Sequence, residues 1–349
     1  MPSVVCDELD EWIVQSLQLD GRASFSRIGE VLGVSAQTVA RRYRRLRAAQ
    51  AVRVIGKPYL KVIGHAAWVL RIECTPDSAE RIATALAARE NTNWVRLTTG
   101  GGEIICGLRA APQEEQQILA TLPRTPRVVG FSAHCLLRRF RGGPAPWTGW
   151  TRPLGAEQIR ELSGGRPDAP FAAADRAPDG RVVELDPVAR KLLEVLGVDG
   201  RTPVSELAAR AGISETAARR RLQELTDRGV LYFEVDIDTR AVGMNIEATV
   251  WLTVPPAALN ATGSALARHP EVCFAAATTG RTSLLADVRC RDIDAFYAYL
   301  SESVGAIPHV TQAETAIHSR TLKRQIGLPP LRAQAAPVTR KAVATGRGR

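Results

Sequence analysis

The stretch DGRASFSRIGEVLGVS at residues 20–35 recurs as DGRTPVSELAARAGIS at residues 199–214. The second copy starts at Asp199 and the first at Asp20, so the shift is 179 residues, and it persists on both sides of the motif. Further along, TTG at residues 98–100 recurs at 278–280 with one residue of drift. Chance does not keep register over such a distance, so the chain is a tandem duplication of a unit of roughly 140 residues.

The first part of each unit is predicted to be helical. After a plausible Asp7 N-cap, Leu9, Ile13, Val14 and Leu17 follow at helical spacing. A second helix follows; in the second copy Thr202-Pro203 resembles an N-cap with proline at the first helical position. A glycine turn at Gly33 or Gly212 then precedes a third helix, which Ser35 or Ser214 caps. This order predicts a helix-turn-helix, of winged-helix-like form, in each unit.

The second part of each unit alternates between strand and helix patterns. In the first copy the strand-like segments are VRVIGKPYLKVIG, AAWVLRIEC, NWVRLTTG and EIICGLRA. Helical patterns, SAERIATALAAR and PQEEQQILATL, lie among them. The order predicts a ferredoxin-like βαββαβ domain, so the fold class is α+β with the same pair of domains twice.

Domain boundaries follow from these patterns. We expect helix-turn-helix domains at residues 1–52 and 185–231 and ferredoxin-like domains at 53–140 and 232–325. Residues 141–184, rich in Gly, Pro, Ala and Arg, are predicted to be a linker with one helix around GAEQIRELS. Residues 326–349 are predicted to be a basic disordered tail.

The overall charge favours a polyanionic partner. The net charge is +10 and the isoelectric point is about 9.8, although only five of the 46 basic residues are lysine, a bias that codon usage also produces. The sequence has no signal-peptide core and no apolar run of membrane-spanning length, so we expect a cytoplasmic, nucleoid-associated protein. The six cysteines form no C-x-x-C pair, which predicts reduced thiols and no metal site.

The third helix of the first unit, VSAQTVARRYRRLRA at residues 34–48, carries five arginines and no acid. Val39, Tyr43 and Leu46 share the face that we expect to be buried, and the opposite face is basic. Such a helix enters the major groove of DNA, where arginine binds guanine and glutamine binds adenine. A solvated helix face is the plainer alternative, but it would normally mix both signs of charge. The side chains that we expect to contact DNA are Ser35, Gln37, Thr38, Arg41, Arg42, Arg44 and Arg45 in the first copy and Ser214, Glu215, Thr216, Arg220, Arg221 and Gln223 in the second.

These motifs resemble the Lrp/AsnC family of regulators in a duplicated form. The resemblance rests on DELDEWIVQSLQLDGR, LGVSAQTVARRYRRL, LDPVARKLLEVLGVDGR, AGISETAARRRLQEL and VTQAETAIHSRTLKR. It implies a sequence-specific transcriptional regulator that binds double-stranded DNA, with one chain as a covalent pseudo-dimer. It also implies that the ferredoxin-like (RAM) domains assemble larger homo-oligomers and bind amino acids or related effectors.

The resemblance places effector residues in two loops. They are Thr99, Gly100 and Glu103 in the first copy and Thr279 and Gly280 in the second. The family loop reads Gly-x-x-Asp; here only the first copy keeps an acid, so we expect any effector there. The alternative is that both glycines only make strand turns with positive φ.

Some relatives of the family are sirohaem-type tetrapyrrole decarboxylases, so an enzyme is the alternative function. None of the five histidines is paired at metal-ligand spacing, and no catalytic set stands out. We therefore predict a protein that is not an enzyme and that has no cofactor. An adaptor whose helix-turn-helix binds protein is a third reading, which the basic third helix disfavours.

Overall fold

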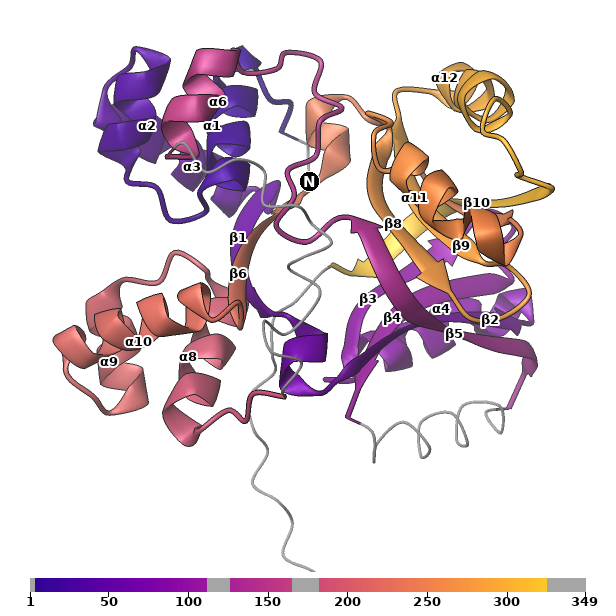
Figure 1. Ribbon diagram of the computed structural model, residues 1–349, viewed down its shortest axis with the longest axis horizontal. Helices are drawn as coiled ribbons and strands as arrows, with labels where there is room; N and C mark the ends of the chain where they lie inside the picture. The colour runs from indigo at the N-terminus through magenta and orange to yellow at the C-terminus, as the bar shows by residue number, and fades with distance from the viewer. Residues whose placement is uncertain (1–3, 112–125, 165–181, 325–349) are drawn as a thin grey trace, which may run out of the picture.

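Three helices form the helix-turn-helix of the first unit. The computed structural model describes residues 4–111, 126–164 and 182–324, and Figure 1 shows their arrangement. The helices are α1 (Glu8–Leu19), α2 (Phe25–Leu32) and α3 (Ala36–Ala48). Asp7 closes a capping box at the start of α1, and Ser35 caps α3. Gly33 ends α2 with a φ of 68°, a backbone conformation that glycine adopts without strain.

The second unit repeats this arrangement with α8 (Pro187–Val198), α9 (Val204–Ala211) and α10 (Glu215–Asp227). Ser214 caps α10, as predicted. The prediction for α9 was wrong by one residue, because Pro203 occupies the N-cap position and the helix begins at Val204. The hydroxyl of Thr202 instead donates to the Asp199 carbonyl.

A two-stranded ribbon connects the two helical clusters. β1 (Val52–Pro58) pairs antiparallel with β6 (Leu231–Ile237), so each unit supplies one of the two strands of the ribbon. These strands were expected to belong to the ferredoxin-like domains that we placed at residues 53–140 and 232–325. That expectation was wrong for these segments, because the ribbon is a separate sheet.

The remaining strands form one closed barrel from both units. Its order is β10-β3-β4-β2-β5-β8-β9-β7, and the β5–β8 and β10–β3 pairs join the two halves. The first unit supplies β2 (Ala66–Cys74), β3 (Thr92–Thr98), β4 (Glu103–Ala110) and β5 (Val128–Arg141). The second supplies β7 (Ile246–Thr253), β8 (Val272–Thr278), β9 (Leu284–Cys290) and β10 (Gln312–Lys323).

Helices cover the outside of the barrel (Figure 1). They are α4 (Pro76–Ala87), α11 (Leu259–Leu266), α12 (Ile293–Ala298) and the π-helical turn η5 (Tyr299–Val304) that continues α12. Short 3-10 turns are η1 (Leu60–Ile63), η3 (Thr239–Val242) and η4 (Pro256–Ala258). The predicted βαββαβ order is confirmed in the second unit; the helix predicted at residues 112–122 lies outside the described residues. No described helix is long and apolar enough to cross a bilayer.

The segment that we expected to be a linker is largely part of the first helical cluster. Residues 141–164, which we call the strap, bury Trp147, Trp150, Leu154 and Leu162 in the same core as α1–α3. The strap contains the predicted helix, α6 (Ala156–Leu162), which packs beside α1 and α2. The linker prediction was therefore wrong for these residues, because four large apolar side chains bind them to the core. Residues 165–181 and the predicted tail lie outside the described residues.

Candidate nucleic-acid interface

Helix α3 has one buried face and one exposed basic face. The buried stripe is the predicted one and consists of Val39, Tyr43 and Leu46. Gln37, Arg41 and Arg44 are exposed on the other side, and Thr38 is half-buried at its edge. The Arg44 side chain donates to the Ala40 carbonyl of its own helix, and its charge meets no acid among the described residues. Gln37, Arg41 and Arg44 therefore form a surface that can bind phosphate and base edges.

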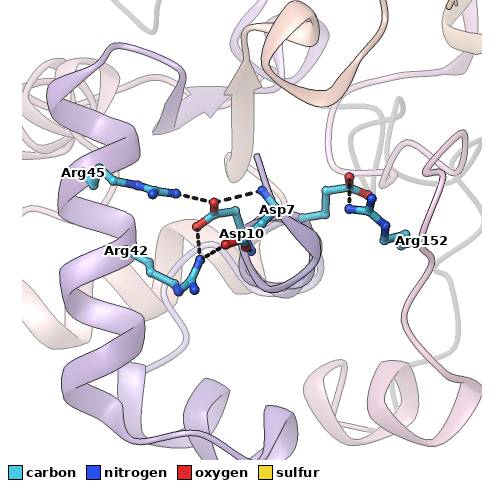
Figure 2. A network of polar contacts seen from close by, with 6 residues as sticks. Asp7, Asp10, Arg42, Arg45 and Arg152 are labelled. Atoms are coloured by element: carbon cyan, nitrogen blue, oxygen red, sulfur yellow. Dashed lines mark hydrogen bonds and ion pairs between the residues drawn. The ribbon is translucent and has the colours of Figure 1, made fainter. Parts of the chain in front are cut away.

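Two other arginines of α3 point toward α1 instead (Figure 2). Nη1 of Arg42 lies 2.5 Å from Oδ2 of Asp7 and 3.1 Å from Oδ1 of Asp10. Arg45 donates to the other oxygen of Asp10, whose side chain is fully buried. Arg42 keeps only 24% of its side chain exposed, whereas Arg45 keeps 51%. The pair therefore ties α3 to the N-terminus of α1.

This network lowers the pKa of Asp7. Partial burial acts in the opposite direction, but the hydrogen bond from Arg42 and that from the Asp10 N–H outweigh it. The structure thus gives Arg42 and Arg45 a structural role in joining α3 to α1. A DNA contact at either arginine stays a prediction. The run of arginines could not reveal this, because the acids lie more than thirty positions earlier in the chain.

The second unit uses the same device. Arg221 of α10 pairs with Asp186, the N-cap of α8, and also with Glu224 at 2.8 Å. Gln223 donates to Asp227, one turn further along α10. Arg221 therefore has a structural role as well, and a DNA contact at Arg221 or Gln223 stays a prediction.

The exposed N-terminal part of α10 is more mixed in charge than that of α3. Glu215, Thr216, Arg219 and Arg220 are exposed. Arg219 was missed by sequence reasoning; its counterpart in the first copy is the uncharged Ala40. The charge of Glu224, further along α10, is shared between Arg221 and Arg228. Each helix therefore presents two exposed arginines with no acid partner among the described residues, Arg41 and Arg44 on α3 and Arg219 and Arg220 on α10, but α10 adds the exposed acid Glu215.

The cap serines have a defined local role. The Ser35 hydroxyl accepts from the Thr38 N–H, and that of Ser214 accepts from the Ala217 N–H. Both serines remain exposed, so they stand at the helix N-termini, where backbone N–H groups favour an anion. A phosphate contact at either serine remains a prediction.

The two helical clusters are held together by a reciprocal clasp. Arg22 donates to the carbonyls of Gly200 and Thr202, and Arg201 donates to those of Gly21 and Ala23. Gly21 fits this turn because a Cβ there would lie 2.7 Å from the Phe233 side chain. The repeated DGR motif thus fixes one helix-turn-helix against the other, a function that the sequence pattern did not show.

The predicted effector loops are engaged in contacts within the barrel. Gly100 and Gly280 adopt φ angles of 104° and 109°. Nε of Arg71 donates to the Glu103 carboxylate at 2.7 Å, so this acid already holds a cation. A Cβ at Gly280 would lie 2.6 Å from the His134 ring. These contacts favour the alternative in which the glycines make strand turns.

The Thr99 and Thr279 backbones close the same loops. The Thr99 N–H donates to the Ile317 carbonyl, and the Thr279 N–H donates to that of Cys135. The Thr279 hydroxyl also accepts from the Cys135 N–H. These residues therefore serve strand closure in the structure. An effector at the loops remains untested.

All six cysteines are free thiols, and burial raises the pKa of Cys6 to about 12. The described residues hold no cluster of three or more histidine, cysteine or acidic side chains that could bind a metal.

Two helix-turn-helix clusters stand on one barrel, to which each unit contributes four strands. This arrangement defines a class of proteins with a pair of DNA-binding-type domains. Family comparison agrees with this geometry: residues 7–47 and 185–226 match the AsnC-type helix-turn-helix domain, and residues 247–328 match the Lrp/AsnC ligand binding domain. The chain belongs to the Lrp/AsnC family.

Single-unit regulators are among the similar proteins. HTH-type transcriptional regulator FL11 of Pyrococcus horikoshii is 28% identical over 148 residues, which is 42% of this chain and 97% of that protein. An uncharacterised HTH-type transcriptional regulator of the same organism is 30% identical over 141 residues, which is 40% of this chain and 89% of that protein. Regulator AldR of Mycobacterium tuberculosis is 28% identical over 148 residues, 41% of this chain and 83% of AldR.

A solved structure shares the fold over both units. The siroheme decarboxylase NirDL superposes with a TM-score of 0.61 at 15% identity, covering 93% of this chain and 94% of that one. At this identity the likeness concerns the fold alone.

Proposed function

We propose that this chain is a sequence-specific transcriptional regulator that binds duplex DNA with α3 and α10. The observation that carries the proposal is the exposed face of α3, where Gln37, Arg41 and Arg44 stand free of acids while Arg42 is paired internally. The similarity to HTH-type regulators supports it. Association with the chromosome, in the cytoplasm, follows from this function.

The same geometry supports a pseudo-dimer within one chain. The clasp of Arg22 and Arg201, together with the β1–β6 ribbon, holds the two helix-turn-helix clusters in a fixed relation. A rigid pair of DNA-binding helices selects half-sites about one helical turn apart or a multiple of it. Further self-association through the barrel domains would add more such pairs.

Selection of bound fragments from genomic DNA, followed by mobility shifts, tests this function. We expect a fragment that outcompetes bulk DNA, with an affinity that falls steeply as salt rises, because phosphate contacts release counterions. Equal, weak binding of every fragment would refute the proposal.

We infer that the protein is a regulator rather than a tetrapyrrole decarboxylase. A decarboxylase does not need the exposed arginines of α3. Two buried histidines of the barrel also have protein partners: His134 contacts Ser132 and the Thr279 carbonyl, and His318 contacts Thr249. Incubation with sirohaem under reducing and oxidising conditions should leave the tetrapyrrole unchanged. Loss of a carboxyl group from the tetrapyrrole, detected by mass spectrometry, would instead support the hypothesis that the protein is a decarboxylase.

A further inference from the structure

A large cavity lies where the barrel meets the ribbon and the strap. Its volume is about 820 Å³, which is within the usual range for small-molecule sites. Strands of both units line it, together with residues of the β1–β6 ribbon and the start of the strap. Its walls are rich in aromatic side chains: Trp68, Trp94, Phe274, Trp147, Tyr232 and Phe233. The aromatic content of the whole chain is only 5%, so this concentration is specific to the cavity.

Charged side chains form the barrel end of this cavity. Nη1 of Arg96 donates to Asp287 at 2.8 Å, and both residues are more than nine-tenths buried. Nη1 of Arg289 lies 2.8 Å from Glu247, whose side chain is 21% exposed. His318, also buried, contacts the Thr249 hydroxyl at 2.9 Å through Nε2. Burying ion pairs carries a desolvation cost that apolar residues of similar volume avoid.

The duplication shows that the fold itself does not require these charges. In the second unit, Glu247 pairs across the strands with Arg289, and Thr249 pairs with Asp287. The corresponding pairs in the first unit are Ala67 with Arg109 and Val69 with Gly107. The first unit therefore keeps the same strand register with Ala67, Val69 and Gly107. The second unit has Glu247, Thr249 and Asp287 at the same three positions. A role other than folding explains why the cluster is present.

The cluster and its walls have donors left for a ligand. A guanidinium carries five N–H groups, and the hydrogen bond of Arg96 to a described residue uses Nη1. Cζ of Arg96 lies over the Trp94 ring, 4.4 Å from its centroid. The buried indole N–H of Trp68 has no partner among the described residues. The lining contains nine lysines and arginines against five aspartates and glutamates. An occupant that matches these walls is flat, aromatic and anionic.

We propose that this cavity binds a planar aromatic carboxylate, with the carboxylate at Arg96 and Arg289 and the ring against Trp68 and Trp94. The site is distinct from the Gly100 and Gly280 loops, which do not line the cavity. Binding is measured without DNA, so this proposal and the proposed regulatory function can fail independently.

Calorimetry of the full chain with 1-naphthoate and its neutral analogue 1-naphthamide tests the site. The ring is the same in both compounds, so any difference reports the carboxylate. We expect naphthoate to bind at least about tenfold more tightly, a difference of about 1.4 kcal/mol. Equal affinities, or no binding of either compound at millimolar concentration, would overturn the proposal.

Variants place the binding in the cavity. The neutral double variant Arg96→Gln/Asp287→Asn removes the charged pair without leaving one buried charge alone, and it should lose the preference for naphthoate. Arg71→Gln/Glu314→Gln is the matched control, because this ion pair lies in the barrel outside the cavity lining and should leave binding unchanged. Loss of binding in the control as well would overturn the assignment.

A filling variant keeps the test decisive if the neutral pair fails to fold. Ala67 lines the cavity, so Ala67→Phe occupies its space while retaining every charge. This variant should abolish naphthoate binding. Wild-type affinity in Ala67→Phe would overturn the proposal.

Discussion

At the scale of single residues, adjacent arginines of α3 have opposite roles. Arg41 is exposed, with no acid beside it among the described residues, whereas Arg42 is held by Asp7 and by the fully buried Asp10. We expect Arg41→Ala to weaken specific DNA binding by about 1–3 kcal/mol. Its effect on the free energy of unfolding should stay within about 0.5 kcal/mol. Mobility shifts and urea unfolding measure the two quantities.

Arg42→Ala is the matched comparison. Removing this charge takes one partner from the Asp10 carboxylate, so the free energy of unfolding should fall by about 1.5–3 kcal/mol. DNA affinity of the folded fraction should change little. The assignment of roles is wrong if Arg41→Ala destabilises the fold as much as Arg42→Ala does.

The buried His318 predicts a pH dependence of stability. Burial, and then the positive charge of Arg96, lowers the pKa of His318, while Glu247 and Asp287 act in the opposite direction. In the unfolded chain a histidine takes up a proton below about pH 6.5, but in the folded protein His318 is still neutral there. The unfolded state therefore binds more protons, and stability falls as pH decreases below that value.

His318→Gln tests this reasoning, because glutamine can still contact Thr249 but does not titrate. Urea unfolding between pH 7.5 and 5.5 should show a shallower loss of stability in the variant. The loss should not vanish, because His134 and His269 also have lowered pKa values, caused mainly by burial. An unchanged slope would mean that His318 is not the buried neutral base described here.

At the scale of elements, the sequence predicted those that local patterns define. Serine caps, glycine turns and the stripe of Val39, Tyr43 and Leu46 all act within one helix or turn, and they were found as predicted. The predictions that failed concern features that depend on partners far away in the sequence. These features are the packing of the strap, the pairing of the ribbon strands and the acids of α1 that bind arginines of α3. A Gly- and Pro-rich composition suggests a linker, and only the tertiary contacts of Trp147 and Trp150 show that the segment is packed.

The strap predicts a local difference in stability between the two helix-turn-helix clusters. Trp150 is buried against the first cluster, and its indole N–H donates to Gln18. Trp150→Ala should lower the free energy of unfolding by about 3–5 kcal/mol. Hydrogen exchange should speed up in α1 and α2 but not in α8 and α9. Tyr297→Ala, which removes an aromatic ring that is 72% exposed, serves as the control and should have almost no effect.

At the scale of the whole molecule, the clasp predicts that the protein selects a fixed spacing of half-sites. Arg22 and Arg201 anchor each helical cluster on backbone carbonyls of the other. Inserting about half a helical turn between the half-sites should abolish binding by the wild type, because the second helix then faces the wrong side of the duplex. Arg22→Ala/Arg201→Ala should bind its best site more weakly but discriminate less between spacings. Identical spacing preferences in both proteins would contradict a role for the clasp.

One chain with two unlike DNA-binding helices should also select an asymmetric operator. Arg41 and Arg220 correspond in the repeat and are both exposed, but Arg44 of α3 is matched by Gln223, which donates to an acid of its own helix. The two half-sites should therefore share at most the base feature that the common arginine contacts, and the first helix should contribute more affinity. Footprinting should show that Arg41→Ala weakens protection more than Arg220→Ala does, each first at its own half-site. Self-association that brings in a second chain would yield a larger, symmetric footprint, which sedimentation of the complex detects. In a one-chain complex, a perfect palindrome that both variants lose equally would exclude the asymmetric operator.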